Sequence, residues 1–141
     1  MTYEELLEKH RQEANQLVNE DKIIILIGNT EDALAKMKEK GVTADELVNV
    51  GAGAFVKRDH YDEVMAIFDR HADEQKQYAL NHTYEVVKYY LWDYEIEISL
   101  SYTYEDAIYK LVGLTKDEAN ARIDEIDKAI KDYRKEFYEI N

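Results

Sequence analysis

The sequence predicts an α+β fold in which a small, mainly antiparallel sheet of about four strands is covered by helices, with a helix-rich C-terminal part. Three observations predict this class. Apolar residues recur at helical spacing after capping boxes, short β-branched or glycine-bounded runs lie between these segments, and one later segment alternates strictly between polar and apolar residues. The 141 residues include no proline, linker or repeat, so residues 1–141 are expected to form a single domain.

A helix, a strand and a second helix are predicted first. A capping box opens a helix over residues 2–19, whose apolar residues form one stripe. Residues 23–27 are apolar, mostly β-branched and followed by glycine, which predicts a strand buried on both faces and central in the sheet. A helix over residues 30–40 then has Thr30 as its cap and ends at Gly41, a residue suited to a left-handed C-terminal cap.

A β-hairpin that leads into a long helix is predicted next. Two short apolar runs, residues 47–50 and 54–56, flank a glycine-containing turn, and a capping box at residues 43–46 forms about one helical turn before them. From Asp59, a favourable N-cap, apolar residues at helical spacing continue toward Leu80. The hairpin therefore connects a short helical turn to a long helix.

The turn of this hairpin has a second interpretation as an anion site. Gly51 and Gly53 follow a strand, and Lys57 and Arg58 precede a helix, as in a phosphate-binding loop. However, Val56 stands where the dinucleotide fingerprint needs a small residue, and the Gly-Lys-Ser/Thr of the P-loop is absent. A structural hairpin turn is the favoured interpretation, and anion binding is the alternative.

After a break, helical spacing resumes over residues 83–91, and then the period changes. Polar and apolar residues alternate over residues 93–104, which predicts that residues 95–102 form the longest strand of the sheet. Two further capping boxes, at residues 103–106 and 115–118, open a short helix and the C-terminal helix. The second half is therefore expected to add the fourth strand and most of the remaining helix.

An acidic, tyrosine-rich tract is the strongest candidate for a partner-binding surface. Residues 93–106 contain five acidic and no basic residues, and seven of the 12 tyrosines fall within residues 84–109. Alternate carboxylates on a strand lie ~6.6 Å apart, about the spacing of phosphates along a nucleic-acid strand, so the row would fit a basic groove. The alternative is a solvated strand face whose charges prevent edge aggregation. The candidate partner-binding residues are Tyr84, Tyr89, Asp93, Glu95, Glu97, Glu105, Asp106 and Tyr109.

The composition of the chain argues against several other classes of protein. A net charge of −13 repels nucleic acid and anionic lipid, so we expect a basic protein partner and no direct nucleic-acid or membrane contact. No apolar run approaches the ~20 residues of a membrane-spanning helix, and no leader opens the chain, so a cytoplasmic protein is expected. With no cysteine, and no serine or threonine in a nucleophile-elbow context, we expect neither an enzyme nor a cofactor.

The histidines do not form a metal-binding set by spacing. His60, His71 and His82 stand 11 residues apart, so on one helix neighbours would be ~16 Å from each other. A pair such as His10 with Glu13 offers two ligands but no third. We expect no bound metal, and we expect the histidines to lie on the surface or to cap helices.

Short motifs lie along most of the chain: Tyr3-x-Glu-Leu-Leu7-x-Lys-His10, Val50-Gly-Ala-Gly-Ala-Phe-Val-Lys-Arg58, Met65-x-x-Phe-x-Arg-His71, the tyrosine-rich tract ending in Glu105-Asp106, and Leu111-x-Gly-Leu114-Thr115. Together they resemble a family of small acidic proteins from phages and other bacterial mobile elements. Glu95-Ile96 departs from the Asn-His that precedes the strand in that family, and Ala54 stands where glycine is usual, so no role for that Asn-His pair is carried over. The resemblance implies a context of host-defence inhibition, such as anti-CRISPR or DNA-mimicking anti-restriction proteins.

These observations lead to one main hypothesis and two alternatives. The main hypothesis is an anti-defence protein, most specifically an anti-CRISPR inhibitor, that occupies the basic groove of a nucleic-acid-binding effector nuclease through the acidic, tyrosine-rich surface. The first alternative is a small non-enzymatic interaction or regulatory module, with a homodimer through the long helices as one form. The second is a ligand-binding protein or enzyme that uses the Gly51 turn with Lys57 and Arg58.

Overall fold

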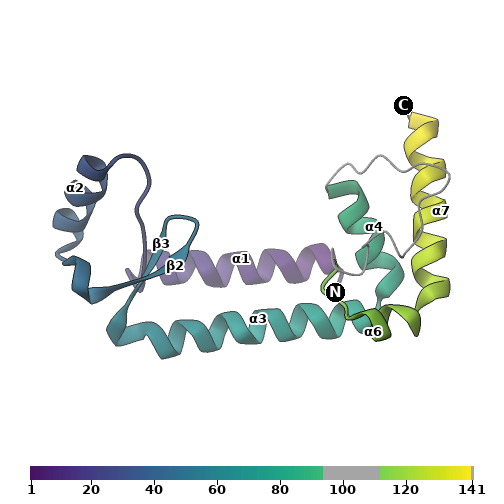
Figure 1. Ribbon diagram of the computed structural model, residues 1–141, viewed down its shortest axis with the longest axis horizontal. Coiled ribbons are helices and arrows are strands. Elements are labelled where there is room, and N and C mark those ends of the chain that lie inside the picture. Colours follow the sequence, from purple (N-terminus) through teal and green to yellow (C-terminus); the bar gives the residue numbers. More distant parts are fainter. Residues whose placement is uncertain (94–111, 141) are drawn as a thin grey trace. The chain divides into compact units, whose positions relative to one another are not determined.

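The computed structural model describes residues 1–93 and 112–140 and confirms the α+β class, with many helices and a three-stranded antiparallel sheet (Figure 1). The expected fourth strand, residues 95–102, and the short helix expected from residue 103 lie outside the described residues. The α-helices are α1 (Tyr3–Asn19), α2 (Thr30–Lys40), α3 (Tyr61–Asn81), α4 (Thr83–Asp93), α6 (Lys116–Asn120) and α7 (Ile123–Ile140). The strands are β1 (Ile23–Ile25), β2 (Leu47–Gly51) and β3 (Ala54–Lys57), and two 3₁₀ turns are η1 (Ala44–Glu46) and η2 (Arg58–His60).

The chain divides into two compact units. The sheet unit comprises Leu7–His71, and the α4–α7 unit comprises Met1–Leu6 together with Ala72–Asn141. The expectation of a single domain stays a prediction.

Among the described strands the order is β1-β3-β2, so β3 lies between the other two. Within the part of the sheet that the structure describes, residues 23–25 are therefore not the central strand predicted for residues 23–27, although burial on both faces is correct for Ile23 and Ile24. Ile23 packs with Val56 on one face of the sheet, whereas Ile24 packs with Leu47 on the other. Because helices cover both faces, an edge strand here has the same apolar composition as a central one.

Two apolar clusters hold the sheet unit together. On one face, Leu17 of α1 and Val64 of α3 pack with Ile23 and Val56. On the other face, Met37 of α2 packs against the cluster that contains Ile24. The alternation of neighbouring residues between the two clusters follows from the two-residue period of a strand.

The predicted hairpin is confirmed, with β2 and β3 pairing in antiparallel register and a bulge between Asn49 and Gly51. Gly51, Ala52 and Gly53 all have positive φ angles, which is the conformation a tight turn of this kind requires. A Cβ atom on Gly53 would lie 3.1 Å from the carbonyl oxygen of Leu26. The glycine pattern is therefore explained by the turn and by this close backbone approach.

Three helix termini differ from expectation. The side chain of Asn29, rather than Thr30, caps α2 by accepting from the N–H of Asp32 at 2.8 Å. Asp59 does not cap the long helix, because residues 58–60 form a 3₁₀ turn before α3 begins at Tyr61. Thr115 does form its capping box, but the helix that it opens stops at Asn120 and α7 starts afresh at Ile123.

The prediction that histidines lie on the surface or cap helices is wrong for His10 and His71. Both are buried in the sheet unit, and their rings stack with centroids 4.0 Å apart and 13° between planes. Glu13 lies beside them, with Oε2 3.5 Å from Nε2 of His71, and also pairs with Arg70. The Arg70 hydrogen bond is the main reason that the pKa of Glu13 lies below its usual value. His10 follows Leu6 by four residues, so helical spacing alone places it on the apolar stripe.

Candidate functional site

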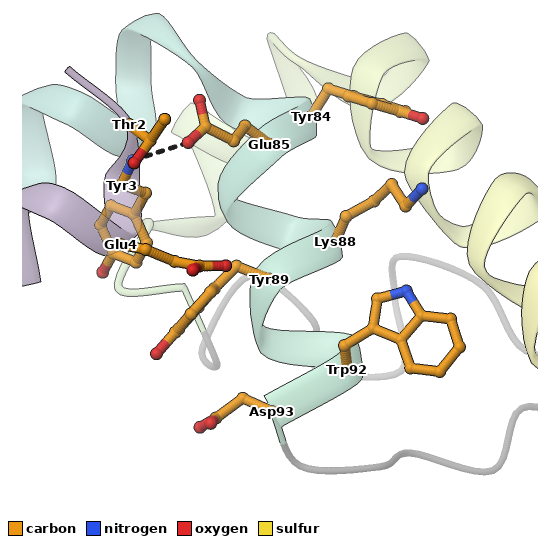
Figure 2. A pocket seen from close by; sticks show the side chains of 9 residues that line it. All are labelled: Thr2, Tyr3, Glu4, Tyr84, Glu85, Lys88, Tyr89, Trp92 and Asp93. Atoms are coloured by element: carbon orange, nitrogen blue, oxygen red, sulfur yellow. Dashed lines mark hydrogen bonds between the residues drawn. The ribbon is translucent and has the colours of Figure 1, made fainter.

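A groove of about 740 Å³ lies along α4 in the α4–α7 unit (Figure 2). This volume falls within the range of about 300–1,000 Å³ that is typical of ligand sites. Its described lining combines aromatic rings with acidic side chains and a lysine. The lining residues are Thr2, Tyr3, Glu4, Tyr84, Glu85, Lys88, Tyr89, Trp92 and Asp93.

Helical spacing gives α4 two different faces. Thr83, Val86, Val87 and Leu91 are fully buried and join the apolar core of the unit. The groove face carries positions two, three, six, seven, ten and eleven of the helix, which the 3.6-residue period places on one side. Because the core face is buried against neighbouring elements, the groove side chains project from a fixed backbone.

The N-terminal segment closes one side of the groove through Glu85. Its carboxylate accepts a hydrogen bond from the backbone N–H of Tyr3 at 2.6 Å, shown as the dashed line in Figure 2, and another from the hydroxyl of Tyr78 at 2.6 Å. The Tyr78 hydroxyl also lies 3.1 Å from the carbonyl oxygen of Met1. Both oxygens of Glu85 are therefore used to hold the start of α1 against α3 and α4.

Tyrosine rings pack together behind this contact. Tyr3 lies 5.3 Å from Tyr89 and 5.5 Å from Tyr78 between ring centroids, and its hydroxyl is 2.6 Å from that of Tyr90. Burial and then the Tyr90 hydroxyl raise the pKa of Tyr3 above its ordinary value. Burial and then Glu85 raise the pKa of Tyr78 to about 12. These phenols are therefore neutral hydrogen-bonding groups at physiological pH.

The other side of the groove faces α7, toward which Tyr84, Lys88 and Trp92 extend (Figure 2). The hydroxyl of Tyr84 donates to Asp132 at 2.5 Å, and Lys88 donates to Glu136 at 2.6 Å. Lys88 also lies 5.6 Å from the centroid of the Tyr84 ring. Burial alone would lower the pKa of Lys88, but the hydrogen bond to Glu136 and the interaction with Tyr84 raise it above its usual value.

The groove carries negative charge at its rim. Among the described lining residues, three side chains are carboxylates and one is an ammonium group, that of Lys88, which is paired with Glu136. Glu4 and Asp93 are exposed, whereas Tyr84, Tyr89 and Trp92 are half-buried. Exposed carboxylates next to partly exposed aromatic rings favour a cationic group with an apolar stem.

Three of the eight predicted partner-binding residues, Tyr84, Tyr89 and Asp93, come together in this groove. Tyr84 and Tyr89 are half-buried and packed against neighbours, so they form walls of the groove rather than isolated surface rings. The other five predicted residues lie outside the described part of the chain: Glu95, Glu97, Glu105, Asp106 and Tyr109.

The sequence interpretation missed six lining residues. Glu85, Lys88 and Trp92 could have been found, because they share a helix face with Tyr84 and Tyr89. Thr2, Tyr3 and Glu4 stand about 80 positions earlier in the chain, and no local pattern links them to α4.

The structure offers little support for an anion site at the Gly51 turn. Near the hairpin, a smaller pocket of about 300 Å³ is lined by Val48, Arg58, Tyr61 and Asp62. Nε of Arg58 donates to the carbonyl oxygen of Asp45 at 2.6 Å, so this guanidinium helps to hold the preceding 3₁₀ turn. The pocket also contains a carboxylate, which disfavours an anionic ligand.

Within residues 1–93 and 112–140, no group of three or more His, Cys, Asp or Glu side chains is arranged to hold a metal ion. None of the helices in those ranges combines the length and apolar character needed to cross a bilayer.

Comparison with known protein families matches residues 2–136 to a family of unknown function, DUF7659. No curated protein and no solved structure matches the chain.

Proposed function

The chain belongs to the DUF7659 family over nearly its whole length, and we propose that it is a non-enzymatic anti-defence protein of a phage or mobile element. In this proposal it acts in the bacterial cytoplasm as an anti-CRISPR inhibitor. It binds a basic, nucleic-acid-binding effector nuclease through its acidic, tyrosine-rich surface. It inhibits the nuclease by DNA mimicry or by physically blocking the basic groove.

The observation that carries the proposal is the groove on α4. It brings aromatic rings and exposed carboxylates together on a protein whose net charge is −13. Tyrosine and tryptophan are enriched at the energetic centres of protein interfaces, where they bury a large area with few rotatable bonds. A surface of this composition fits a basic protein better than it fits an anion or nucleic acid.

Electrostatics supports the same partner class. Nucleic-acid-binding grooves are lined with Lys and Arg, and an acidic protein is steered toward them by long-range attraction. Such steering raises the association rate and weakens with salt, because charges beyond about 8–10 Å are screened at physiological ionic strength. Binding by this protein should therefore be strongly salt-dependent.

A pull-down from nuclease-treated bacterial lysate tests the partner class. The bait is the wild-type protein, and the matched baits are Glu4→Lys/Asp93→Lys in the groove and Glu39→Lys/Asp69→Lys, two exposed acids of the sheet unit. The proposal predicts that basic nucleic-acid-binding proteins are retained by the wild type and the control but not by the groove variant. Retention of only non-basic partners, insensitive to salt, would contradict it.

One feature favours the alternative of an interaction module that pairs with itself. Helix α2 has no buried residue, Leu34 on it is 60% exposed, and Ile27 just before it is 76% exposed. Exposed apolar side chains of this kind are typical of contact surfaces. Light scattering measures the molar mass of the wild type and of Ile27→Ser/Leu34→Ser. If the protein dimerises through α2, the wild type should be a dimer and the variant a monomer.

A further inference from the structure

We propose that helix α2 forms a homodimer contact in which the α2 helices of two copies pack antiparallel about a two-fold axis. The inference is independent of the anti-defence proposal, and it rests on the self-pairing alternative for the identity of the partner. It adds the helix face that makes the contact, the direction of the two helices and the residues that meet. The α2 stripe that carries it comprises four exposed residues: Glu31, Leu34, Ala35 and Lys38.

Helix α2 has two faces in different environments. Ala33, Met37 and Lys40 are partly buried, and Met37 packs against the apolar cluster that contains Ile24. The residues of the α2 stripe are three or four positions apart, so the helical period places them within an arc of about 100° on another side of the helix. Leu34, near the middle of this stripe, is 60% exposed. The stripe therefore presents an apolar centre to a second molecule.

The charges of the α2 stripe are arranged so that the stripe is complementary to a reversed copy of itself. Glu31 lies in the first turn of the helix and Lys38 in the last, each three positions from the nearer of the two central residues. A two-fold axis between Leu34 and Ala35 would place Glu31 of each copy beside Lys38 of the other. The same axis would set Leu34 against the small side chain of Ala35. A two-fold interface requires this kind of self-complementary surface.

Glu31 and Lys38 are available for such a contact. Among the described residues, neither side chain forms a hydrogen bond or an ion pair, whereas the neighbouring Lys40 pairs with Asp21 at 2.9 Å. In a parallel pair of α2 helices, Glu31 would face Glu31 and Lys38 would face Lys38, and like charges repel at such separations. The charges therefore favour the antiparallel direction.

The region around α2 is the part of this acidic chain where two copies repel each other least. The whole chain has a net charge of −13, but residues 22–58 carry six basic and five acidic side chains. A contact between helices of 11 residues is small beside the roughly 800 Å² per partner of a stable interface. The dimer should therefore be weak and should depend on protein concentration.

Sedimentation equilibrium of the full-length protein, from about 10 µM to 1 mM, tests the contact because weak dimers dissociate in this range. We expect the mean mass of the wild type to rise from that of a monomer toward that of a dimer. Glu31→Lys and Lys38→Glu should each weaken dimerisation at least fivefold, because each makes both intermolecular ion pairs repulsive. Glu31→Lys/Lys38→Glu should restore the dissociation constant to within twofold of the wild type.

The matched controls are Glu39→Lys and Lys36→Glu, which make the same charge changes at exposed positions of α2 outside the stripe. Each should change the dissociation constant no more than twofold, with circular dichroism confirming that every variant folds. The double variant of the stripe opposes the helix dipole at both ends, so it is the least favourable for α2 by itself. Recovery of dimerisation in that variant would therefore report pairing between copies and not helix stability.

A second arm mixes the two single variants of the stripe in equal amounts. The antiparallel arrangement predicts a heterodimer, because the basic stripe of one variant then faces the acidic stripe of the other. A wild type that stays monomeric at every concentration would overturn both the inference and the self-pairing alternative. If the wild type dimerises but the single variants do so equally well, the antiparallel contact is wrong and self-pairing stands. Inhibition of an effector nuclease by the wild type is a separate measurement, and its failure would affect only the anti-defence proposal.

Discussion

Glu85 links the N-terminal wall of the groove to α4 and α3. It lies on α4, yet its two oxygens bind the backbone of Tyr3 and the hydroxyl of Tyr78, each at 2.6 Å. Hydrogen bonds to a charged acceptor contribute roughly 1.5–3 kcal/mol each when buried and less when partly exposed. The N-terminal wall of the groove is therefore held in part by this one carboxylate.

Replacing Glu85 by glutamine tests this role. The isosteric amide keeps the shape but weakens both hydrogen bonds, so we expect the free energy of unfolding to fall by about 1–2 kcal/mol. Urea denaturation measures the change. Glu139→Gln, at an exposed position of α7, is the control and should change stability by less than about 0.5 kcal/mol. A similar effect of both substitutions would show that Glu85 does not hold the N-terminal segment.

Tyr78 makes stability sensitive to alkaline pH. Its pKa is raised from 10.0 to about 12, first by burial and then by Glu85. Since the unfolded phenol ionises first, the stabilisation from Tyr78 is fully present below pH 10 and is lost as the pH rises to about 12.

Tyr78→Phe should therefore be less stable than the wild type near neutral pH, with the difference shrinking between pH 10 and about 12. Denaturant titrations across this range measure it, with the exposed Tyr138→Phe as the control. A difference that stays constant through this pH range would contradict the assignment of the raised pKa to Tyr78.

At the scale of elements, the β2–β3 hairpin depends on three consecutive residues with positive φ. Ala52 adopts a φ of 53°, a conformation that costs a residue with a Cβ roughly 1–2 kcal/mol. Gly53 has a φ of 78° and also approaches the carbonyl oxygen of Leu26. The backbone is therefore strained at Ala52, whereas Gly53, which has no Cβ, adopts a positive φ without this strain.

Substitutions at Ala52 and Gly53 should change the free energy of unfolding in opposite directions. Ala52→Gly should raise the free energy of unfolding by about 0.5 kcal/mol, because relief of strain exceeds the added entropy of the unfolded chain. Gly53→Ala should lower it by about 2 kcal/mol through strain and the close contact. Thermal denaturation of both variants measures the signs, and two changes of the same sign would refute this account of the turn.

Most elements could be predicted from sequence because their signals are local. Capping boxes, the glycines of the hairpin and the periods of 3.6 and 2 marked the helices and the described strands to within a few residues. The order of the strands could not be predicted, because Ile23 and Ile24 are buried on both faces whether β1 is central or at an edge. Whether a segment forms a helix or a strand depends on residues close together in the sequence. The order of the strands in the sheet depends instead on contacts between residues far apart in the sequence.

The groove was only partly predictable for the same reason. Tyr84, Tyr89 and Asp93 are predictable from local composition, and helical spacing adds Glu85, Lys88 and Trp92. Its N-terminal side arises from hydrogen bonds between residues 82 positions apart, as from Tyr3 to Glu85. No periodic pattern in the sequence predicts such a contact.

For the whole molecule, the net charge of −13 is the property that most narrows the choice of partner. The acidic tract beyond α4 is expected to extend the binding surface. Lysine substitutions at Glu95, Glu97, Glu105 and Asp106 should therefore weaken partner binding at least tenfold at low salt and by a smaller factor at high salt. If the tetra-lysine variant folds and binds normally, mimicry of a nucleic-acid backbone by this tract is wrong.

The most direct test of the central claim is inhibition of purified CRISPR effector nucleases, measured as DNA cleavage across several effector types. We predict that the wild type inhibits at least one effector at near-equimolar ratio in a salt-sensitive way. Glu4→Lys/Asp93→Lys should require at least tenfold more protein, and Glu39→Lys/Asp69→Lys should act like the wild type. Inhibition that is unchanged in the groove variant, or full cleavage by every effector in the presence of excess wild-type protein, would contradict the account.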